Sequence, residues 1–148
     1  LETQSYELVN KRESFDTGDL GSLDKNKNLN LFGRSKNIII KGGQNISPEN
    51  LEKKISKLTF VSEACAVPIK DKFYGENICL LIKTQNNCKL SYRFLEQYIK
   101  QNFTKLEFPK KIIHVRSILR NNNYKILRKN IIANLKSNNK NILYEKNY

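Results

Sequence analysis

The chain has 148 residues, a length that suits one domain or one domain with a piece of another. Hydrophobic residues make up 39% of it and charged residues 28%, which is too apolar for a disordered chain. No apolar run approaches the roughly 20 residues that a membrane-spanning helix needs, so we expect no membrane span. Because the sequence contains no Met, we expect it to be a piece of a longer protein.

The net charge of +13 comes from residues 35–148, where 22 basic residues stand against 8 acidic ones, whereas residues 1–34 hold 5 basic and 6 acidic ones. Such an asymmetry can indicate nucleic-acid binding. Most of the excess, however, is Lys scattered beside Asn, and aromatic residues are not interleaved with it as base stacking requires. We therefore expect a solvated basic surface and no nucleic-acid partner.

The three cysteines, Cys65, Cys79 and Cys88, are odd in number and contain no C-x-x-C pair, and His114 is the only histidine. This pattern fits neither a zinc site nor a disulfide framework, so we expect no metal site in the chain. Reduced thiols are typical of the cytosol, and we predict a cytoplasmic location.

In chain order, residues 1–32 are predicted to form short extended segments and turns, with a strand at 6–9 and a hairpin tip at 24–28. This segment is too short and too polar to have its own core. A different pattern follows, in which a β-branched run at 38–40 precedes a glycine turn at 41–45 that needs positive φ.

A helix is predicted to begin after Ser47, which is a good N-cap, because Pro48 suits the first helical position. Ser91 is a second candidate N-cap. The further elements expected are strands at 64–69 and 78–82, a helix at 90–103, a strand at 112–115, a helix at 126–135 and a frayed Asn/Lys-rich end at 137–148. This order predicts an α+β fold, in which helices flank a short sheet and a β-rich segment precedes it.

Several motifs occur in an order and spacing that resemble one family. They are residues 16–21 (DTGDLG), 33–39 (GRSKNII), 41–48 (KGGQNISP), 61–64 (VSEA), 75–76 (GE), 108–111 (FPKK) and 124–128 (YKILR). Together they resemble the carboxyl-terminal motifs of adenylate-forming enzymes, which include acyl-CoA synthetases, nonribosomal-peptide adenylation domains and luciferases. The resemblance implies that residues 1–34 end a large adenylating domain, that 35–136 form a small mobile domain and that 137–148 are a tail.

The resemblance also implies roles for individual residues. The family's aspartate at the position of Asp19 accepts hydrogen bonds from the ribose hydroxyls of ATP and AMP. The arginine at the position of Arg34 approaches the nucleotide, because a guanidinium suits ribose or phosphate oxygens. Lys36 stands at the family's hinge between the two domains, where the change in sequence pattern independently supports a boundary.

Four residues, Gly42, Gly43, Gln44 and Asn45, match the loop that enters the active site for the second half-reaction. Glycines there let the backbone lie close to the thiol arm of CoA. The form Gly-Gly-x-Asn-Ile-x-Pro is more similar to acyl-CoA ligases than to peptide-synthetase domains.

Lys125 matches the family's catalytic lysine. A long mobile ammonium can neutralise the negative charge that builds up on phosphate and carboxylate oxygens during adenylation. Tyr124 stands where the family usually has Gly, which indicates a stiffer loop or a divergent member with altered activity. Two alternatives stay open for the lysine: Lys125 is one more solvated lysine, or a displaced loop gives its role to Lys129.

The resemblance thus implies the carboxyl-terminal part of an ATP-dependent acyl-CoA ligase that acts on a small carboxylic acid, ATP and CoA. Mg²⁺ is expected to be held mainly by the upstream domain. The family's phosphate loop, adenine segment and acyl pocket do not occur in this sequence, so we expect no activity from the chain alone. Two alternatives remain: an adenylation enzyme that loads a carrier-protein phosphopantetheine, and a basic binding module without activity.

Overall fold

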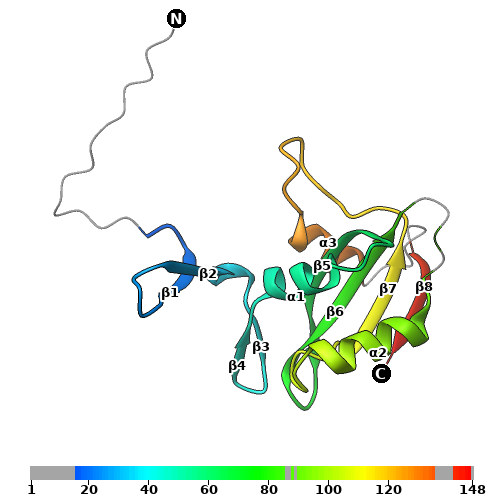
Figure 1. The fold of residues 1–148 in the computed structure, drawn as a ribbon. Coiled ribbons are helices and arrows are strands. Elements are labelled where there is room, and N and C mark those ends of the chain that lie inside the picture. The colour runs from blue at the N-terminus through cyan, green and yellow to red at the C-terminus, as the bar shows by residue number, and fades with distance from the viewer. Residues whose placement is uncertain (1–15, 86–87, 89, 136–141, 148) are drawn as a thin grey trace, which may run out of the picture.

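The structure is a computed structural model that describes residues 16–85, 88, 90–135 and 142–147. The strand predicted at residues 6–9 lies outside these ranges. Figure 1 shows a two-stranded ribbon next to a larger body, in which helices lie on both faces of a sheet. The predicted α+β class is confirmed.

The ribbon is an antiparallel hairpin of β1 (Asp19–Leu23) and β2 (Leu29–Arg34). At its tip, the Asp24 carboxylate accepts a hydrogen bond from the backbone N–H of Asn28 at 2.8 Å, which confirms the predicted hairpin. The four leucines of the ribbon are exposed: Leu20, Leu23, Leu29 and Leu31. The ribbon therefore holds together by backbone pairing, and its described side chains add nothing to the buried core.

The larger sheet has six strands: β3 (Ile39–Lys41), β4 (Gln44–Ile46), β5 (Val61–Asp71), β6 (Gly75–Thr84), β7 (Lys111–Val115) and β8 (Ile142–Asn147). In its middle, β6 pairs antiparallel with β5 and parallel with β7, and β8 pairs antiparallel with β7. The β3–β4 hairpin joins the start of β6 through the pair Lys41–Gly75. This places the turn between β3 and β4 next to the turn between β5 and β6.

The helices are the short 3-10 helix η1 (Ser35–Asn37), α1 (Pro48–Ile55), α2 (Tyr92–Asn102) and α3 (Arg128–Asn134). Alternate residues of a strand point to opposite faces of the sheet. Leu80 accordingly clusters with Leu51 of α1 and Leu95 of α2, whereas its neighbour Leu81 clusters with Ile131 of α3. Both faces of the sheet are buried. None of the described helices is long and apolar enough to cross a membrane.

Both predicted N-caps are confirmed. The Ser47 hydroxyl accepts a hydrogen bond from the backbone N–H of Asn50 at 3.2 Å, and the Ser91 hydroxyl accepts one from Phe94 at 3.4 Å. Pro48 occupies the start of α1, as predicted.

Two predictions at the end of the chain are wrong. Residues 142–147, expected to be frayed, form β8. Without β8, β7 would be an edge strand with unpaired backbone N–H and C=O groups, and pairing with β8 satisfies these groups. The last helix begins at Arg128 and not at residue 126. The reason is that Ile126 forms a β-bridge with Arg120, which holds the preceding residues in an extended conformation.

Candidate functional site

The two residues predicted to contact the nucleotide lie opposite each other at the open end of the ribbon. Arg34 Nε lies 3.2 Å from Asp19 Oδ1, and the side chains are 51% and 35% exposed, respectively. The turn before Asp19 is fixed by Gly18, whose φ is +69° and whose N–H donates to Asp16 Oδ1 at 2.8 Å. The ribbon thus presents a carboxylate suited to vicinal hydroxyls beside a cation suited to phosphate.

Lys36 lies in η1, which joins the ribbon to β3, and its side chain is exposed. Before it, Ser35 donates from its backbone N–H and its hydroxyl to the carbonyl oxygen of Gly18, at 2.8 and 3.2 Å. After it, the Asn37 side-chain amide donates to Glu49 Oε1 of α1 at 2.7 Å. Lys36 therefore separates a residue bonded to the ribbon from one bonded to α1. Both its hinge role and the predicted domain limits stay predictions.

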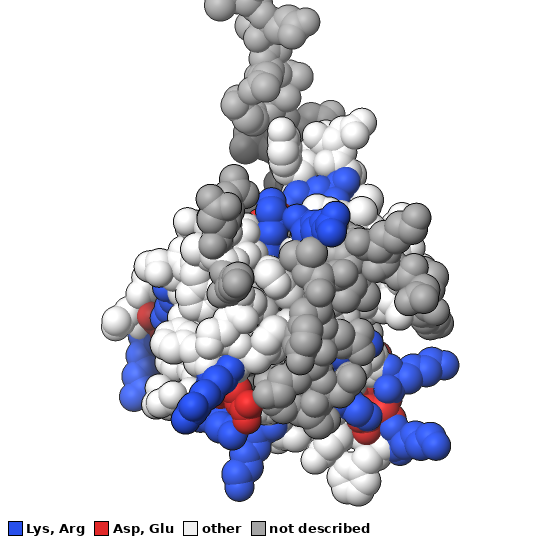
Figure 2. Space-filling view, turned by 90° about the vertical axis from the view of Figure 1, so that its right-hand side faces the viewer, with Lys and Arg blue, Asp and Glu red and all other residues white. Residues whose placement is uncertain are grey.

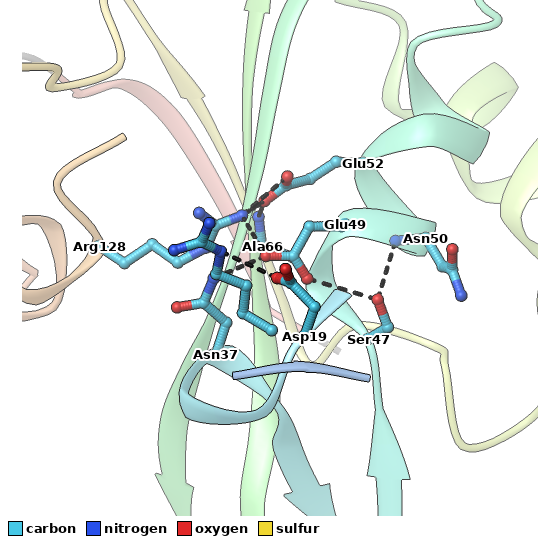
Figure 3. A network of polar contacts seen from close by, with 9 residues as sticks. Asp19, Asn37, Ser47, Glu49, Asn50, Glu52, Ala66 and Arg128 are labelled. Atoms are coloured by element: carbon cyan, nitrogen blue, oxygen red, sulfur yellow. Dashed lines mark hydrogen bonds and ion pairs between the residues drawn. The ribbon is translucent and has the colours of Figure 1, made fainter. Parts of the chain in front are cut away.

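Beside this junction lies a polar network centred on Arg128, the first residue of α3 (Figure 3). Arg128 Nη2 donates to both carboxylate oxygens of Glu52, at 2.7 and 2.8 Å, and lies 3.5 Å from Glu49 Oε1. Glu52 also accepts from the backbone N–H of Ala66 in β5, at 2.9 Å. Burial raises the pKa of the Glu52 carboxyl, although Arg128 acts in the opposite direction. The network ties α1, β5 and the start of α3 to the segment that carries Lys36.

Gly33, at the end of β2, comes unusually close to α1. A Cβ added there would lie 2.5 Å from Glu49 Oε2 and 2.9 Å from Ser47 Oγ, and the φ of +136° is itself one that favours glycine. The ribbon can approach the amino-terminal end of α1 because this position has no side chain.

The predicted glycine turn is confirmed. Gly42 and Gly43 connect β3 to β4 with φ values of +58° and +78°. The Gly42 N–H donates to the carbonyl oxygen of Tyr74, in the neighbouring β5–β6 turn, at 3.0 Å. Gln44 and Asn45, expected in the turn, are residues of β4 because they pair with β3, and they line a cleft of about 490 Å³ that the ribbon also borders.

A larger cleft, of about 910 Å³, opens beside the same turn. Six lysines line it: Lys41, Lys70, Lys72, Lys100, Lys105 and Lys110. Lys41 is only 4% exposed; its Nζ donates to the Phe108 carbonyl oxygen at 2.8 Å and lies 5.3 Å from the centroid of the Tyr74 ring. Burial lowers the pKa of the Lys41 ammonium, although Asp71 acts in the opposite direction. Clustered cations beside aromatic rings suit a ligand that carries phosphates and a flat ring system.

Figure 2 shows the right-hand face of Figure 1, on which Lys and Arg side chains stand in separate groups with few acidic ones between them. On that face the described cations form no continuous track of the kind that follows a nucleic-acid backbone.

Lys125 is exposed on the loop between β7 and α3. Its N–H donates to Asn121 Oδ1 at 2.9 Å, and its carbonyl oxygen accepts from the Asn121 N–H at 3.0 Å. Tyr124, at the position where the family usually has Gly, has a φ of +59° and so keeps the left-handed backbone conformation. Arg120 Nη1 donates to the Tyr124 carbonyl oxygen at 2.6 Å.

The structure brings some of the predicted site residues together and separates others. Asp19 and Arg34 form a pair, whereas the loop between β7 and α3, which carries Lys125, and the turn between β3 and β4 lie at opposite ends of the larger body (Figure 1, orange loop and β3–β4 tip). Among the described residues, no group of three or more His, Cys, Asp or Glu side chains could hold a metal ion. The cleft lined by Lys41 and Tyr74 was not predicted, although Lys41 itself begins the motif at residues 41–48.

The chain is similar to several ligases, although no family model matches it. It is 32% identical over 112 residues to the medium-chain acyl-CoA ligase ACSF2, mitochondrial, of Rattus norvegicus, and 37% identical over 117 residues to the acyl-CoA synthetase ALT10 of Alternaria alternata. These matches cover 76% and 77% of the chain, but only 18% and 21% of the relatives. The chain thus spans about a fifth of the length of these curated relatives.

Comparison with solved structures also finds similarity to ligases. The o-succinylbenzoate CoA synthetase (MenE) from Bacillus subtilis, in complex with the acyl-adenylate intermediate OSB-AMP, matches with a TM-score of 0.74 and 30% identity, over 78% of this chain and 23% of that one. Coronafacic acid ligase from Pectobacterium brasiliense shares the fold, with a TM-score of 0.83 and 23% identity, over 98% of this chain and 28% of that one. The chain belongs to the adenylate-forming enzyme superfamily, is of the acyl-CoA synthetase type and corresponds to the family's carboxyl-terminal region.

Proposed function

We propose that this chain is the carboxyl-terminal part of an ATP-dependent acyl-CoA ligase. Such an enzyme converts a carboxylic acid and ATP into an acyl-adenylate and pyrophosphate, and then transfers the acyl group to the thiol of CoA. The observation that carries the proposal is the placement of the loop that carries Lys125 and of the β3–β4 turn at opposite ends of one body (Figure 1). A rotation about Lys36 can then present either end to the same active site.

For the adenylation step, Asp19 accepts hydrogen bonds from the two ribose hydroxyls, and Arg34 shields the negative charge nearby. Lys125 places its ammonium between the carboxylate and the α-phosphate, where negative charge develops in the transition state. Mg²⁺ would be held mainly by the upstream domain. The exposed position of Lys125 supports this role, because the side chain has to enter and leave an active site built mainly by another domain.

For the transfer step, the Gly42–Gly43 turn lies against the thiol arm of CoA, and the lysine cleft beside it binds the phosphates at the other end of the molecule. Support comes from the contact between the two features: the Gly42 N–H is bonded to Tyr74, and the Tyr74 ring is also packed against Lys41 in the cleft. A carrier-protein phosphopantetheine, the alternative acceptor, has a single phosphate and so offers the exposed lysines of the cleft fewer anionic groups to bind.

The first test is pyrophosphate release by the full-length protein across a panel of carboxylic acids, with and without CoA. Lys125→Ala is expected to slow acyl-adenylate formation by on the order of a hundredfold, because one preorganised charge is lost. Lys129→Ala is the matched control, since Lys129 is also exposed and lies one turn further along. Equal, small effects of the two substitutions would contradict the assignment of Lys125, and a loss confined to Lys129→Ala would move the role there.

The second test uses the opposite end of the body. Gly43→Val is expected to leave adenylation intact and to block thioester formation from supplied acyl-adenylate, whereas Lys125→Ala is expected to spare that step. If a carrier-protein phosphopantetheine is the acceptor, free CoA supports no thioester formation even in the unsubstituted protein. The chain alone is expected to be inactive, because it spans only about a fifth of its relatives.

A further inference from the structure

The loop that carries Lys125 is closed by a single side chain. Asn121 Oδ1 accepts hydrogen bonds from the backbone N–H of Asn123 at 3.0 Å and of Lys125 at 2.9 Å. The backbone of Asn121 also bonds to Lys125 and Tyr124, since its N–H donates to the Lys125 carbonyl oxygen and its own carbonyl oxygen accepts from the Tyr124 N–H, at 3.0 and 2.9 Å. Both backbone polar groups of Lys125 are therefore held by one residue.

A second connection fastens this loop to the sheet. Arg120 donates from Nη1 to the Tyr124 carbonyl oxygen at 2.6 Å and from Nε to Glu63 Oε2 of β5 at 2.9 Å. Lys83 of β6 donates to the other oxygen of Glu63 at 2.7 Å. The peptide bond just before Lys125 is thus linked through two side chains to the central strands.

The loop needs these contacts because of Tyr124. A left-handed φ of +59° costs a residue with a side chain roughly 1–2 kcal/mol relative to glycine. Tyr124 is 81% exposed, so burial of its ring offsets little of this cost. The contacts of its backbone with Arg120 and Asn121 are what stabilise the conformation.

We infer that Asn121 and Arg120 are positioning residues for the adenylation step, which hold the backbone of Lys125 in place so that its ammonium reaches the reacting oxygens. The inference rests on the proposed role of Lys125 and extends it to two residues that do not touch the substrate. A displacement of about 1 Å of a catalytic group can cost a hundredfold in rate, so loosening the loop has a measurable effect.

The test uses the full-length protein with Asn121→Ala, Asn121→Asp and Asn122→Ala. Asn121→Asp keeps an acceptor oxygen at the same place, and Asn122→Ala is the matched control on the neighbouring residue of the loop. Asn121→Ala is expected to lower kcat of adenylation by at least tenfold at unchanged KM for ATP, and to leave thioester formation from supplied acyl-adenylate unchanged. Asn121→Asp is expected to recover most of the rate, and Asn122→Ala to lose none.

A readout besides activity is amide hydrogen exchange in a peptide that covers residues 119–127, which is expected to be faster in Asn121→Ala and normal in Asn121→Asp. In a Lys125→Ala background, Asn121→Ala is expected to cause no further loss of rate, because no ammonium remains to be positioned. Arg120→Lys keeps the charge but cannot contact Glu63 and the Tyr124 carbonyl oxygen at once. It is expected to lower kcat of adenylation by a smaller factor, and it replaces Asn121→Ala if that variant fails to fold.

Three results overturn the inference. If Lys125→Ala slows adenylation but neither Asn121→Ala nor Arg120→Lys does, the positioning role is wrong and the proposed function stands. If both half-reactions slow equally, or Asn121→Asp fails to recover the rate, the residues have only a structural role. If Lys125→Ala itself has no effect, the proposed role of Lys125 fails, and the positioning role fails with it.

Discussion

The Gly42–Gly43 turn and the Lys125 loop share a left-handed backbone and reach it in opposite ways. At Gly42 and Gly43 the conformation has no steric cost, because glycine lacks a Cβ, and a Cβ added at Gly43 would meet nothing within 4 Å. At Tyr124 the same φ is imposed on a residue with a large side chain and is held by hydrogen bonds to Arg120 and Asn121.

This difference suits the two proposed tasks. A turn that must lie against the thiol arm of CoA needs open space and no side chain, which two glycines provide. A loop that must deliver an ammonium to a defined point needs a backbone that does not shift, which side-chain contacts provide. One backbone conformation can therefore serve either access or fixation, depending on the residues that surround it.

The largest effect on stability is expected where a side chain is forced into the glycine turn. Gly43→Ala is expected to lower the free energy of unfolding by about 1 kcal/mol. The steric cost of a left-handed Ala is larger than the gain that comes from the lower conformational entropy of the unfolded chain. Gly42→Ala is expected to cost about 2 kcal/mol, because its Cβ would also lie 3.2 Å from Cδ1 of Tyr74. Urea unfolding of the two variants checks this, and equal losses would show that the Tyr74 ring moves aside freely.

A smaller effect of opposite sign is expected at the other loop. Tyr124→Gly removes the steric cost of the left-handed φ but adds entropy to the unfolded chain, so the net gain in unfolding free energy is about 0.5–1 kcal/mol. The matched control is Asn123→Gly, at a residue without positive φ, which is expected to lose stability. Denaturant unfolding measures both, and a loss of stability in Tyr124→Gly would mean that the tyrosine ring contributes more than its exposure suggests.

The features that could be predicted from the sequence are local ones. A serine before a helix and a pair of glycines between strands act through atoms a few residues away, so Ser47, Ser91 and the Gly42–Gly43 turn were predictable. The motifs also led to the prediction that Asp19 and Arg34 contact the nucleotide, which stays a prediction; the structure places Arg34 Nε 3.2 Å from Asp19 Oδ1.

The features that could not be predicted depend on partners far away in the chain. Strand β8 is rich in polar residues and forms because β7 offers it an edge. The contact that braces the Lys125 loop joins Arg120 to Glu63, 57 residues earlier, and Lys41 is buried because a carbonyl oxygen 67 residues later accepts its hydrogen bond. Neither pairing leaves a pattern in the local sequence.

The smallest expected effect is a change of stability at low pH. It differs between the two loops, because one is closed by a carboxylate and the other by an amide. Asp71 closes the β5–β6 turn behind Gly42: its carboxylate accepts from Lys110 Nζ at 2.8 Å and from the N–H groups of Phe73 and Tyr74, at 2.9 and 3.0 Å. The hydrogen bond from Lys110, together with those from the backbone, holds the pKa of Asp71 well below its usual value near 3.8.

A carboxyl whose pKa is lowered by folding stabilises the protein at pH values above its unfolded pKa, and this contribution disappears as the pH falls from about 4 through the folded pKa. Asp71→Asn is therefore expected to be less stable than the unsubstituted chain at pH 7, with a difference that shrinks steadily below pH 4. Asn121, which closes the other loop, is an amide and does not titrate, so the difference between Asn121→Ala and the unsubstituted chain is expected to keep its size over the same range. Thermal unfolding measured from pH 7 to pH 2.5 tests both expectations, and a pH-independent effect of Asp71→Asn would show that the Asp71 carboxylate gains nothing from its charge.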